Sequence, residues 1–391
     1  MTPPTDIVDS VRRRNLSAVL ELVHRGEAPS RAELTASTGL NRSTVGALVG
    51  ELVDLGLVDE VEPLASARAG RPSPRVVPAS GFTTIAVNPE VDAITAAVVG
   101  LGARVERRVR REVEHPPSPT EAVRVIARLI DELRSTDDAT PAPHAIGIAI
   151  PGIVRRALGD VRWAPHLEWR EVPFARLVRD ATGLPTFADN DATAAAHAEW
   201  LFGAGRGASE LVYLNGGASG IGGGVIVHGR PLGGAHGYAG EFGQNRPGVG
   251  DARDRVTEGG TLEDEVSRSR LLAAVGLASA DEPSLRAALF SASDRVVVAE
   301  MDRQQRILAV AIANAVNVFN PQLVVLGGFL STLLEHRPGA LEAAGEAGSV
   351  PAAWEGVRIA PAALGEDRVL IGAAELAFAP TLADPAGVNA R

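Results

Sequence analysis

The stretch Ala188-Asp189-Asn190-Asp191-Ala192 follows a short apolar strand and opens an alanine-rich helix that reaches Glu199. A strand that passes directly into a helix is the building unit of α/β folds. A carboxylate at such a junction lies near the positive end of the helix dipole and faces the side of the sheet where α/β proteins bind ligands. Asp191 could therefore act as a general base toward a hydroxyl, whereas Asn190 and Asp191 could equally be ordinary helix caps.

The alternation of strands and helices continues through the rest of the chain after Gly81. Because about 310 residues follow that point, two α/β lobes with a cleft between them fit the length better than one oversized sheet. The apolar pattern predicts strands at 83–87, 92–99, 145–150, 211–214 and 323–326, and helices at 119–134 and 302–319.

A glycine-rich segment, Asn215-Gly216-Gly217-Ala218-Ser219-Gly220-Ile221-Gly222-Gly223-Gly224, lies between strand-like runs that end at Leu214 and begin at Val225. Glycine permits backbone conformations closed to other residues, so amides in such a segment can approach an anion or a ring. A tight β-turn between two strands explains the glycines equally well.

Two carboxylates framed by glycine form a third group. Gly240-Glu241-Phe242-Gly243-Gln244 is followed about twenty residues later by Thr261-Leu262-Glu263. Together with Asn190 and Asp191, these residues would supply the acceptors and donors that suit a polyhydroxylated ligand. The alternative is a set of unrelated surface acids.

Residues 7–57 have the pattern of three short helices. The first carries apolar residues three and four positions apart and is ended by Gly26 and Pro29. Ser30-Arg31-Ala32-Glu33 has the form of a capping box, which would open a second helix through Thr38. After a turn at Gly39, Asn41 is the predicted N-cap of a third helix.

The third helix has the features of a DNA-recognition helix. Its apolar stripe leaves Arg42, Ser43 and Thr44 on an exposed first turn, which is where a helix-turn-helix contacts bases. Two short strands, 58–62 and 75–78, joined by a loop with Arg71, would form a wing. The predicted DNA contacts are Arg31, Arg42, Ser43, Thr44 and Arg71, and a three-helix protein-interaction module is the alternative.

The run Arg12-Arg13-Arg14 could add contacts to DNA phosphates, or it could be only a solvated face of the first helix.

The composition excludes several classes of protein. Of 391 residues, 45% are apolar, enough for real cores, and only 4% are aromatic. The absence of cysteine excludes disulfide scaffolds, thiol nucleophiles and Cys-ligated metals, and the absence of lysine excludes Schiff-base chemistry. With no apolar run of about 18 residues and no hydrophobic signal core, we expect a soluble, cytoplasmic protein.

The net charge is −10, but the first 80 residues carry nine Arg against ten acidic residues. A near-neutral head with clustered Arg can face DNA while an acidic body stays away from it.

The order and spacing of these motifs resemble the ROK family of bacterial repressors and sugar kinases, and head plus body resemble its transcriptional regulators. The resemblance extends over nearly the whole chain. It rests on Ile150-Pro151-Gly152, Trp163-Ala164-Pro165 with Trp169, Asn190-Asp191-Ala192 with Glu199, Gly220–Gly224, Gly229, Gly240-Glu241-Phe242-Gly243, Asn320-Pro321 and Leu326-Gly327-Gly328, and Gly70-Arg71-Pro72 also looks like the wing of the family's regulators.

The resemblance implies an actin-like, two-lobed sugar-kinase fold of the ribonuclease H-like type, with sugar bound between the lobes. A winged helix-turn-helix domain at 1–80 would precede an effector domain at 81–391. Lobe one would span about 81–200 plus the C-terminal helix, and lobe two about 201–370. Matching positions imply that sugar hydroxyls contact Gly152, Asn190, Asp191, Glu241 and Glu263, with Asp191 at the position of the kinases' catalytic base.

The turn that handles ATP departs from the kinase members of the family. They open the body with D-x-G-G-T, whose backbone and carboxylate hold the phosphates and metal of ATP. Here Asn88 replaces the acid, Glu90 and Val91 stand at the two glycines, and Pro89 lacks an amide hydrogen. Because phosphoryl transfer depends on positioning and charge neutralisation, we interpret Asp191 as a hydroxyl acceptor and not a catalyst.

The positions of the family's zinc ligands also differ. Many members have a His after Gly-Glu-x-Gly and three cysteines before the later Leu-Glu. Here Gln244 replaces the His and Thr261 stands at the last Cys position, so a tetrahedral N/S site cannot form. The Gln244 amide could replace the His ring in binding an effector.

We therefore expect a sugar-responsive repressor that binds operator DNA as a homodimer or homotetramer, with neither cofactor nor metal and without kinase activity. It would lie on the nucleoid when bound to its operator. The alternative is an ATP-dependent sugar kinase with a regulatory DNA-binding head. A third interpretation is a regulator that has lost its ligand and answers to a protein partner.

Overall fold

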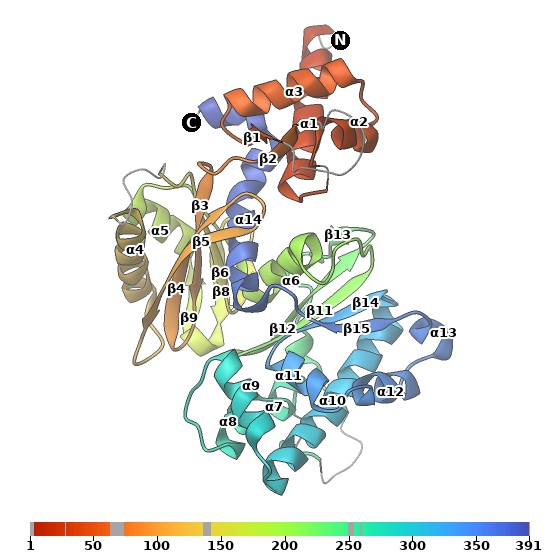
Figure 1. Cartoon of the computed structure of the whole chain (residues 1–391). Coiled ribbons are helices and arrows are strands. Elements are labelled where there is room, and N and C mark those ends of the chain that lie inside the picture. Colours follow the sequence, from red (N-terminus) through yellow and green to blue (C-terminus); the bar gives the residue numbers. More distant parts are fainter. Residues whose placement is uncertain are drawn as a thin grey trace.

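The computed structural model describes residues 4–27, 29–62, 74–135, 142–248, 254–258 and 260–390, and it shows a helical head beside two α/β lobes (Figure 1). The head contains α1 (Pro4–His24), α2 (Arg31–Thr38), α3 (Arg42–Asp54) and an antiparallel pair of strands, β1 (Val58–Val61) and β2 (Arg75–Pro78). The three predicted helices and both predicted wing strands are present. The loop between the strands, residues 63–73 with Arg71, lies outside the described residues.

The N-caps of α2 and α3 are the residues that the sequence predicted, Ser30 and Asn41. The hydroxyl oxygen of Ser30 accepts a hydrogen bond from the Glu33 N–H at 3.3 Å, and the Ser30 hydroxyl donates to the Glu33 carboxylate at 2.6 Å. Gly39 ends α2 with a φ of 69°, which glycine adopts without strain. Asn41 Oδ1 accepts from the Thr44 N–H at 2.8 Å, so Asn41 is the N-cap of α3, as predicted.

Lobe one is built on a mixed sheet with the strand order β10-β6-β3-β4-β5. β3 is antiparallel to β4 and parallel to β6, which is parallel to β10. The strands are β3 (Thr83–Pro89), β4 (Ala93–Gly100), β5 (Arg104–Glu112), β6 (Ile146–Ile150) and β10 (Thr186–Asn190), and a small antiparallel sheet adds β7 (Ile153–Arg155), β8 (Asp160–Ala164) and β9 (Trp169–Val172).

Both faces of this sheet are covered, which explains why every residue of β3 is buried, including the polar Thr83, Thr84 and Asn88. Ile85 and Val87 pack in the core formed with α4 (Pro119–Ser135) and α5 (Phe174–Thr182). Ala86 faces the opposite way, into a core that includes α14 (Arg368–Ala383) and the head.

Lobe two is built on a second five-stranded sheet with the order β13-β12-β11-β14-β15. Its strands are β11 (Leu211–Gly217), β12 (Gly220–Val227), β13 (Arg230–Pro231), β14 (Leu323–Gly328) and β15 (Arg358–Pro361). One face packs against helices that include α10 and α11. The helices of this lobe are α7 (Leu262–Glu265), α8 (Arg268–Ala274), α9 (Glu282–Ser291), α10 (Arg295–Phe319), α11 (Phe329–His336), α12 (Ala340–Ala347) and α13 (Pro351–Trp354).

All five predicted strands of the body are present, and so is the helix predicted at 119–134. The helix predicted at 302–319 starts earlier, at Arg295. Asp294 caps it by accepting from the Val296 N–H at 2.8 Å. The run Val296-Val297-Val298 has low intrinsic helix propensity, so tertiary packing overrides the local signal there.

Two helices lie between the sheets, α6 (Asp191–Phe202) and α14 (Figure 1). They cross very closely, because a Cβ at Gly372 of α14 would lie 2.1 Å from the Ala194 carbonyl oxygen of α6. A Cβ at Gly147 of β6 would lie 1.7 Å from the Ala373 carbonyl oxygen. Neither glycine tolerates a side chain without a shift of backbone, so α6, α14 and β6 form one tightly packed unit.

Among the described residues, no helix is both long enough and apolar enough to span a lipid bilayer.

Candidate functional site

Asn190 ends β10 and caps α6 at the edge of lobe one. Its Oδ1 accepts from the Thr193 N–H at 2.9 Å, so the helix-cap interpretation of Asn190 is correct. Its Nδ2 donates to the carbonyl oxygen of Gly152 at 3.0 Å and to Asp191 Oδ1 at 3.1 Å. One side chain therefore joins three of the residues that the sequence placed in the effector site.

Gly152 follows β6, and its conformation needs glycine. Its φ is 148°, and a Cβ there would lie 2.7 Å from both Ala164 Cβ and the Trp163 carbonyl oxygen. The absence of a side chain lets the small sheet of lobe one approach the Asn190 amide.

The glycine-rich segment forms the β11–β12 hairpin, in which Gly217 pairs with Gly220. A Cβ at Gly222 would lie 2.5 Å from Ala192 Cβ, and one at Gly224 would lie 2.5 Å from Ala196 Cβ. The glycines therefore make a tight turn and also let β12 pack directly on α6. This packing brings lobe two against the helix that starts at Asn190.

Glu263 lies on α7 and is held by lobe two on both carboxylate oxygens. Gln244 Nε2 donates to Glu263 Oε1 at 2.6 Å, and the Ile221 N–H donates to Oε2 at 3.2 Å. A Cβ at Gly220 would lie 2.4 Å from Glu263 Oε2, so the turn glycine makes room for the carboxylate. Gln244 thus contacts Glu263, and its binding to an effector stays a prediction.

The carboxylates of the two lobes act on one another. Partial burial raises the pKa of Glu241, and the negative charges of Asp191 and Glu263 raise it further. Burial likewise raises the pKa of Asp191, and the hydrogen bond from the Ala192 N–H, at 2.8 Å, opposes that shift. Asp191, Glu241 and Glu263 therefore lie close enough for the charges of Asp191 and Glu263 to act on Glu241.

Glu90, which follows β3, belongs to this group as well, although the sequence did not mark it as a ligand contact. Burial raises its pKa to about 7, with further contributions from the charges of Asp92 and Asp191. The signal that could have found it was the replacement of a family glycine by an acid.

Arg368 at the start of α14 is a second residue that the sequence did not reveal. Its guanidinium is buried and donates to Asn215 Oδ1 at 3.1 Å and to both Glu282 oxygens, at 2.6 and 3.2 Å. Its positive charge acts on Asp191 and Glu90 and partly opposes the rise in the pKa of each. The N-terminus of α14 is thus attached to Asn215 of β11 and Glu282 of α9.

Of the predicted DNA-binding residues, Arg42, Ser43 and Thr44 lie at the start of α3 and Arg31 lies on α2, while Arg71 is outside the described residues. Arg42 and Ser43 are exposed, and Thr44 is half-buried. Arg31 on α2 donates to both carboxylate oxygens of Glu60, each at 2.6 Å, so an acid of β1 neutralises part of its charge. Arg12 of the basic run is likewise paired, with Glu51 of α3 at 2.8 Å.

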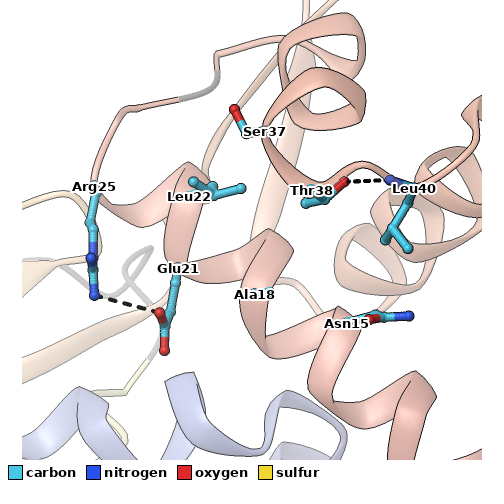
Figure 2. Close-up of a pocket in the computed structure, with 8 residues that line it drawn as sticks. All are labelled: Asn15, Ala18, Glu21, Leu22, Arg25, Ser37, Thr38 and Leu40. Atoms are coloured by element: carbon cyan, nitrogen blue, oxygen red, sulfur yellow. Dashed lines mark hydrogen bonds and ion pairs between the residues drawn. The ribbon is translucent and has the colours of Figure 1, made fainter.

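A pocket of about 270 Å³ opens in the head between α1 and the α2–α3 turn (Figure 2). Arg25 Nη2 lies 3.5 Å from a Glu21 oxygen at its edge, and the Leu40 N–H donates to Thr38 Oγ1 at 3.3 Å. None of its lining residues is a predicted DNA or effector contact. They are Asn15, Ala18, Glu21, Leu22, Arg25, Ser37, Thr38 and Leu40.

Comparison with known proteins places the chain in a family. Residues 84–379 match the sequence profile of the ROK family. The chain belongs to the ROK family. The xylose repressor of Caldicellulosiruptor bescii is 27% identical over 338 residues, covering 81% of this chain and 83% of the repressor. The glucokinase of Thermotoga maritima is 33% identical over 224 residues, covering 53% of this chain and 70% of the kinase.

A solved structure of a ROK family transcriptional regulator, a homologue of the E. coli MLC protein, shares the fold. It superposes with a TM-score of 0.74 at 23% identity and covers 95% of this chain and 97% of the regulator. The two-lobed ROK architecture and the N-terminal helical region are therefore both present.

The zinc positions of the ROK family are used here for other contacts. Gln244 donates to Glu263, and Thr261 forms a capping box with Asp264 at the start of α7. Among the described residues, no group of three or more His, Asp or Glu is arranged to hold a metal ion. These donors, with neither thiolate nor imidazole, do not fit a tetrahedral zinc site.

The turn that binds ATP phosphates in ROK kinases also has another role here. Asn88 Nδ2 donates to the carbonyl oxygen of Ala149 at 3.0 Å and is buried between β3 and β6. Glu90, whose pKa burial raises to about 7, stands at the first of the two glycine positions of the kinase motif. The acid and the two glycines of the kinase motif are thus replaced at this turn.

Proposed function

We propose that this protein is a sugar-responsive repressor of transcription that binds operator DNA and catalyses no phosphoryl transfer. The proposal rests on two features found in one chain. The head has a capped helix with an exposed first turn, and the ROK domain lacks the turn that handles ATP in kinases. Relatives named xylose repressors, which match over most of the chain, support it.

The effector site would hold a polyhydroxylated ligand between the lobes. Asp191 and Glu241 offer carboxylate oxygens to hydroxyl donors, with Glu263 beside them. The amides of Asn190 and Gln244 add further polar atoms. Because carboxylates from both lobes border this space, closing it around a ligand that donates several hydrogen bonds relieves their mutual repulsion.

On DNA, the first turn of α3 would face bases in the major groove, with Arg42 and Ser43 as the exposed donors. A homodimer or homotetramer would place two such helices in successive major grooves, because repressor operators repeat the symmetry of the protein.

The cleft would communicate with the head through α6. This helix starts beside the effector residues and is roughly 18 Å long at 1.5 Å per residue. At its end, the Phe202 ring packs edge-on against the ring of His24, with centroids 5.1 Å apart. The guanidinium carbon of Arg25 lies 5.5 Å from the centre of the Trp200 ring. A shift of α6 on ligand binding therefore reaches the end of α1 directly.

Effector binding need favour one arrangement of head and lobes by only about 1–3 kcal/mol to change operator affinity roughly 5- to 150-fold. We propose that the sugar favours the arrangement that does not fit the operator, so that it releases the repressor.

Genomic footprinting tests the DNA-binding part of the proposal. Discrete bound sites next to genes for sugar transport or catabolism are expected, and protein that binds no site in preference to random DNA would contradict it.

A coupled assay with ATP, Mg²⁺ and a panel of hexoses and pentoses tests the kinase alternative. We expect no turnover above background. Sugar-dependent turnover that disappears in Asp191→Asn would establish the kinase instead.

A further inference from the structure

A buried charge network in lobe two joins α7 to α10, close in sequence to Glu263. Its centre is Glu265, the last residue of α7, whose side chain is fully buried. One Glu265 oxygen accepts from the Val256 N–H at 3.1 Å and the Thr257 N–H at 2.9 Å, and the other accepts from the Val256 N–H at 3.0 Å. This carboxylate therefore ties the loop before α7 to the helix itself.

Arg303 of α10 provides the opposite charge, and all five of its N–H donors have acceptors in the structure. Nη1 donates to Glu265 Oε2 at 3.1 Å and to the Asp254 carbonyl oxygen at 2.9 Å. Nη2 donates to the Glu265 carbonyl oxygen at 2.7 Å. Nε and Nη2 bind the two oxygens of Glu300 at 2.9 and 2.8 Å. One guanidinium thus binds the Asp254 backbone and both the backbone and the side chain of Glu265.

The neighbouring residue on α10 continues the attachment. Gln304 accepts from the Ser267 N–H at 3.1 Å and donates to the Ser267 carbonyl oxygen at 3.1 Å. The backbone on both sides of α7 is therefore bonded to α10. Glu263 lies within this clamped segment, two residues before Glu265, and binds Gln244 and the Ile221 N–H.

We infer that Glu265 and Arg303 are positioning residues for the effector site, and that their ion pair organises the segment without a metal. This inference rests on the proposed function insofar as Glu263 and Gln244 contact the effector. A paired, fully bonded charge can remain buried at modest cost, but loss of one partner leaves the other buried and uncompensated. The segment should then loosen while the head is unaffected.

The first test compares Arg303→Gln with Arg306→Ala as a matched control. Arg306 lies on the same helix and pairs with the Asp254 side chain at 2.6 Å, but its own side chain is 56% exposed. Binding of D-xylose and D-glucose is measured by calorimetry without DNA, and operator binding is measured without sugar. We expect sugar affinity to fall at least about tenfold in Arg303→Gln and less than about twofold in Arg306→Ala, with operator affinity unchanged in both.

A folded Arg303→Gln protein that binds sugar like the wild type would overturn the inference, and so would an equal loss of operator affinity. If Arg303→Gln does not fold, Glu300→Gln removes one charged acceptor of the same guanidinium and takes its place in the comparison. Partial recovery in the double variant Glu265→Gln/Arg303→Gln is expected, because the fully buried Glu265 carboxylate is then no longer left without its partner.

A second readout does not depend on any sugar. Amide hydrogen exchange at residues 254–265 is expected to rise in Arg303→Gln and to stay at the wild-type level in Arg306→Ala. Unchanged exchange in Arg303→Gln would overturn the inference, whether or not the wild-type protein binds either sugar. Failure of the wild-type protein to bind both sugars would instead count against the proposed effector.

Metal analysis completes the test. Purified protein is expected to contain zinc far below one equivalent, and dialysis against EDTA should leave exchange at 254–265 and sugar affinity unchanged. Stoichiometric zinc whose removal loosens this segment would contradict the inference.

Discussion

His24, the last residue of α1, and Glu375 of α14 form a buried pair in which Nε2 lies 3.1 Å from each carboxylate oxygen. His24 Nδ1 accepts from the Gly102 N–H at 2.9 Å, so the proton that faces Glu375 is on Nε2. Both side chains are almost fully buried. The head is therefore attached to the body through a polar contact inside the core that it shares with lobe one.

We expect the His24–Glu375 pair to help transmit the effect of sugar binding from the effector domain to the head. Glu375→Ala leaves the buried Nε2–H of His24 without an acceptor, which costs about 1–3 kcal/mol in the free energy of unfolding. We expect the sugar-induced change in operator affinity to fall toward onefold, with sugar affinity measured without DNA preserved. Glu375→Gln, which still offers an oxygen, should retain most of the response.

Arg13→Ala is the control for the Glu375 variants, because its 3.5 Å pair with Asp384 joins the head to the chain's end on the exposed surface. An exposed ion pair of this kind contributes little to the free energy of unfolding. A folded Glu375→Ala protein with the full sugar response would show that the His24–Glu375 pair does not transmit the effect of sugar binding.

Arg42 should carry base-specific binding. Arg42→Ala is expected to weaken binding to the cognate operator by about 1–3 kcal/mol and to affect random DNA less, because base contacts rather than phosphate contacts are lost. Arg31→Ala should have a smaller effect, since Glu60 already neutralises part of its charge. Fluorescence anisotropy with matched specific and random duplexes measures both, and equal losses on the two duplexes would count against base recognition by Arg42.

Glu241 should affect the response to sugar and not the binding of DNA. In Glu241→Ala we expect sugar affinity to drop by at least about tenfold, as when a hydrogen bond to a charged group is lost. Operator affinity without sugar should stay within about twofold of the wild type. The same drop in operator affinity would show that Glu241 acts on the fold and not on the ligand.

Glu90 should make stability depend on pH. Its folded-state pKa of about 7 lies above the ordinary glutamate value of 4.5, so the folded protein holds a proton between these values that the unfolded chain has released. The contribution of Glu90 is therefore fully present below about pH 4.5 and is lost as the pH rises through 7. Glu90→Gln should gain up to about 3 kcal/mol relative to the wild type at pH 8, and little at pH 5.

Urea unfolding of both proteins at the two pH values measures this difference. Subtracting the variant from the wild type isolates Glu90 from its charged neighbours Asp92, Asp191, Arg110 and Arg368. An equal difference in unfolding free energy between the two proteins at pH 5 and pH 8 would contradict the raised pKa of Glu90.

Local signals in the sequence predicted most of the fold. Asn41 and Ser30 are caps because short polar side chains bond amides three residues ahead, and this is readable from the chain alone. In lobe one, β3, β4 and β6 were visible in the sequence because both of their faces are buried, whereas β5, which is largely exposed, was not predicted. The order of motifs along the chain predicted one effector site for Asn190, Asp191, Glu241 and Glu263. The charges of Asp191 and Glu263 do act on Glu241, and their contact with an effector stays a prediction.

The contacts that join distant segments could not be predicted. His24 and Glu375 are 351 residues apart, and only the packing of α1 on α14 brings them together. Arg303 looked like one more charge on a long helix, and nothing near it in sequence indicates that Glu265 and Asp254 surround it. Arg31 was expected to face DNA, yet its bidentate pair with Glu60 depends on where β1 returns against α2. Pairing of this kind depends on tertiary geometry and leaves no periodic trace in the sequence.

Titration of the preformed protein–operator complex with neutral pentoses and hexoses, with ATP and Mg²⁺ present and ADP followed in the same sample, tests the central claim most directly. The account predicts that at least one sugar lowers operator affinity between about 5- and 150-fold while no ADP forms. A complex that stays intact at every sugar concentration, in a sample where a sugar drives steady release of ADP, would contradict it.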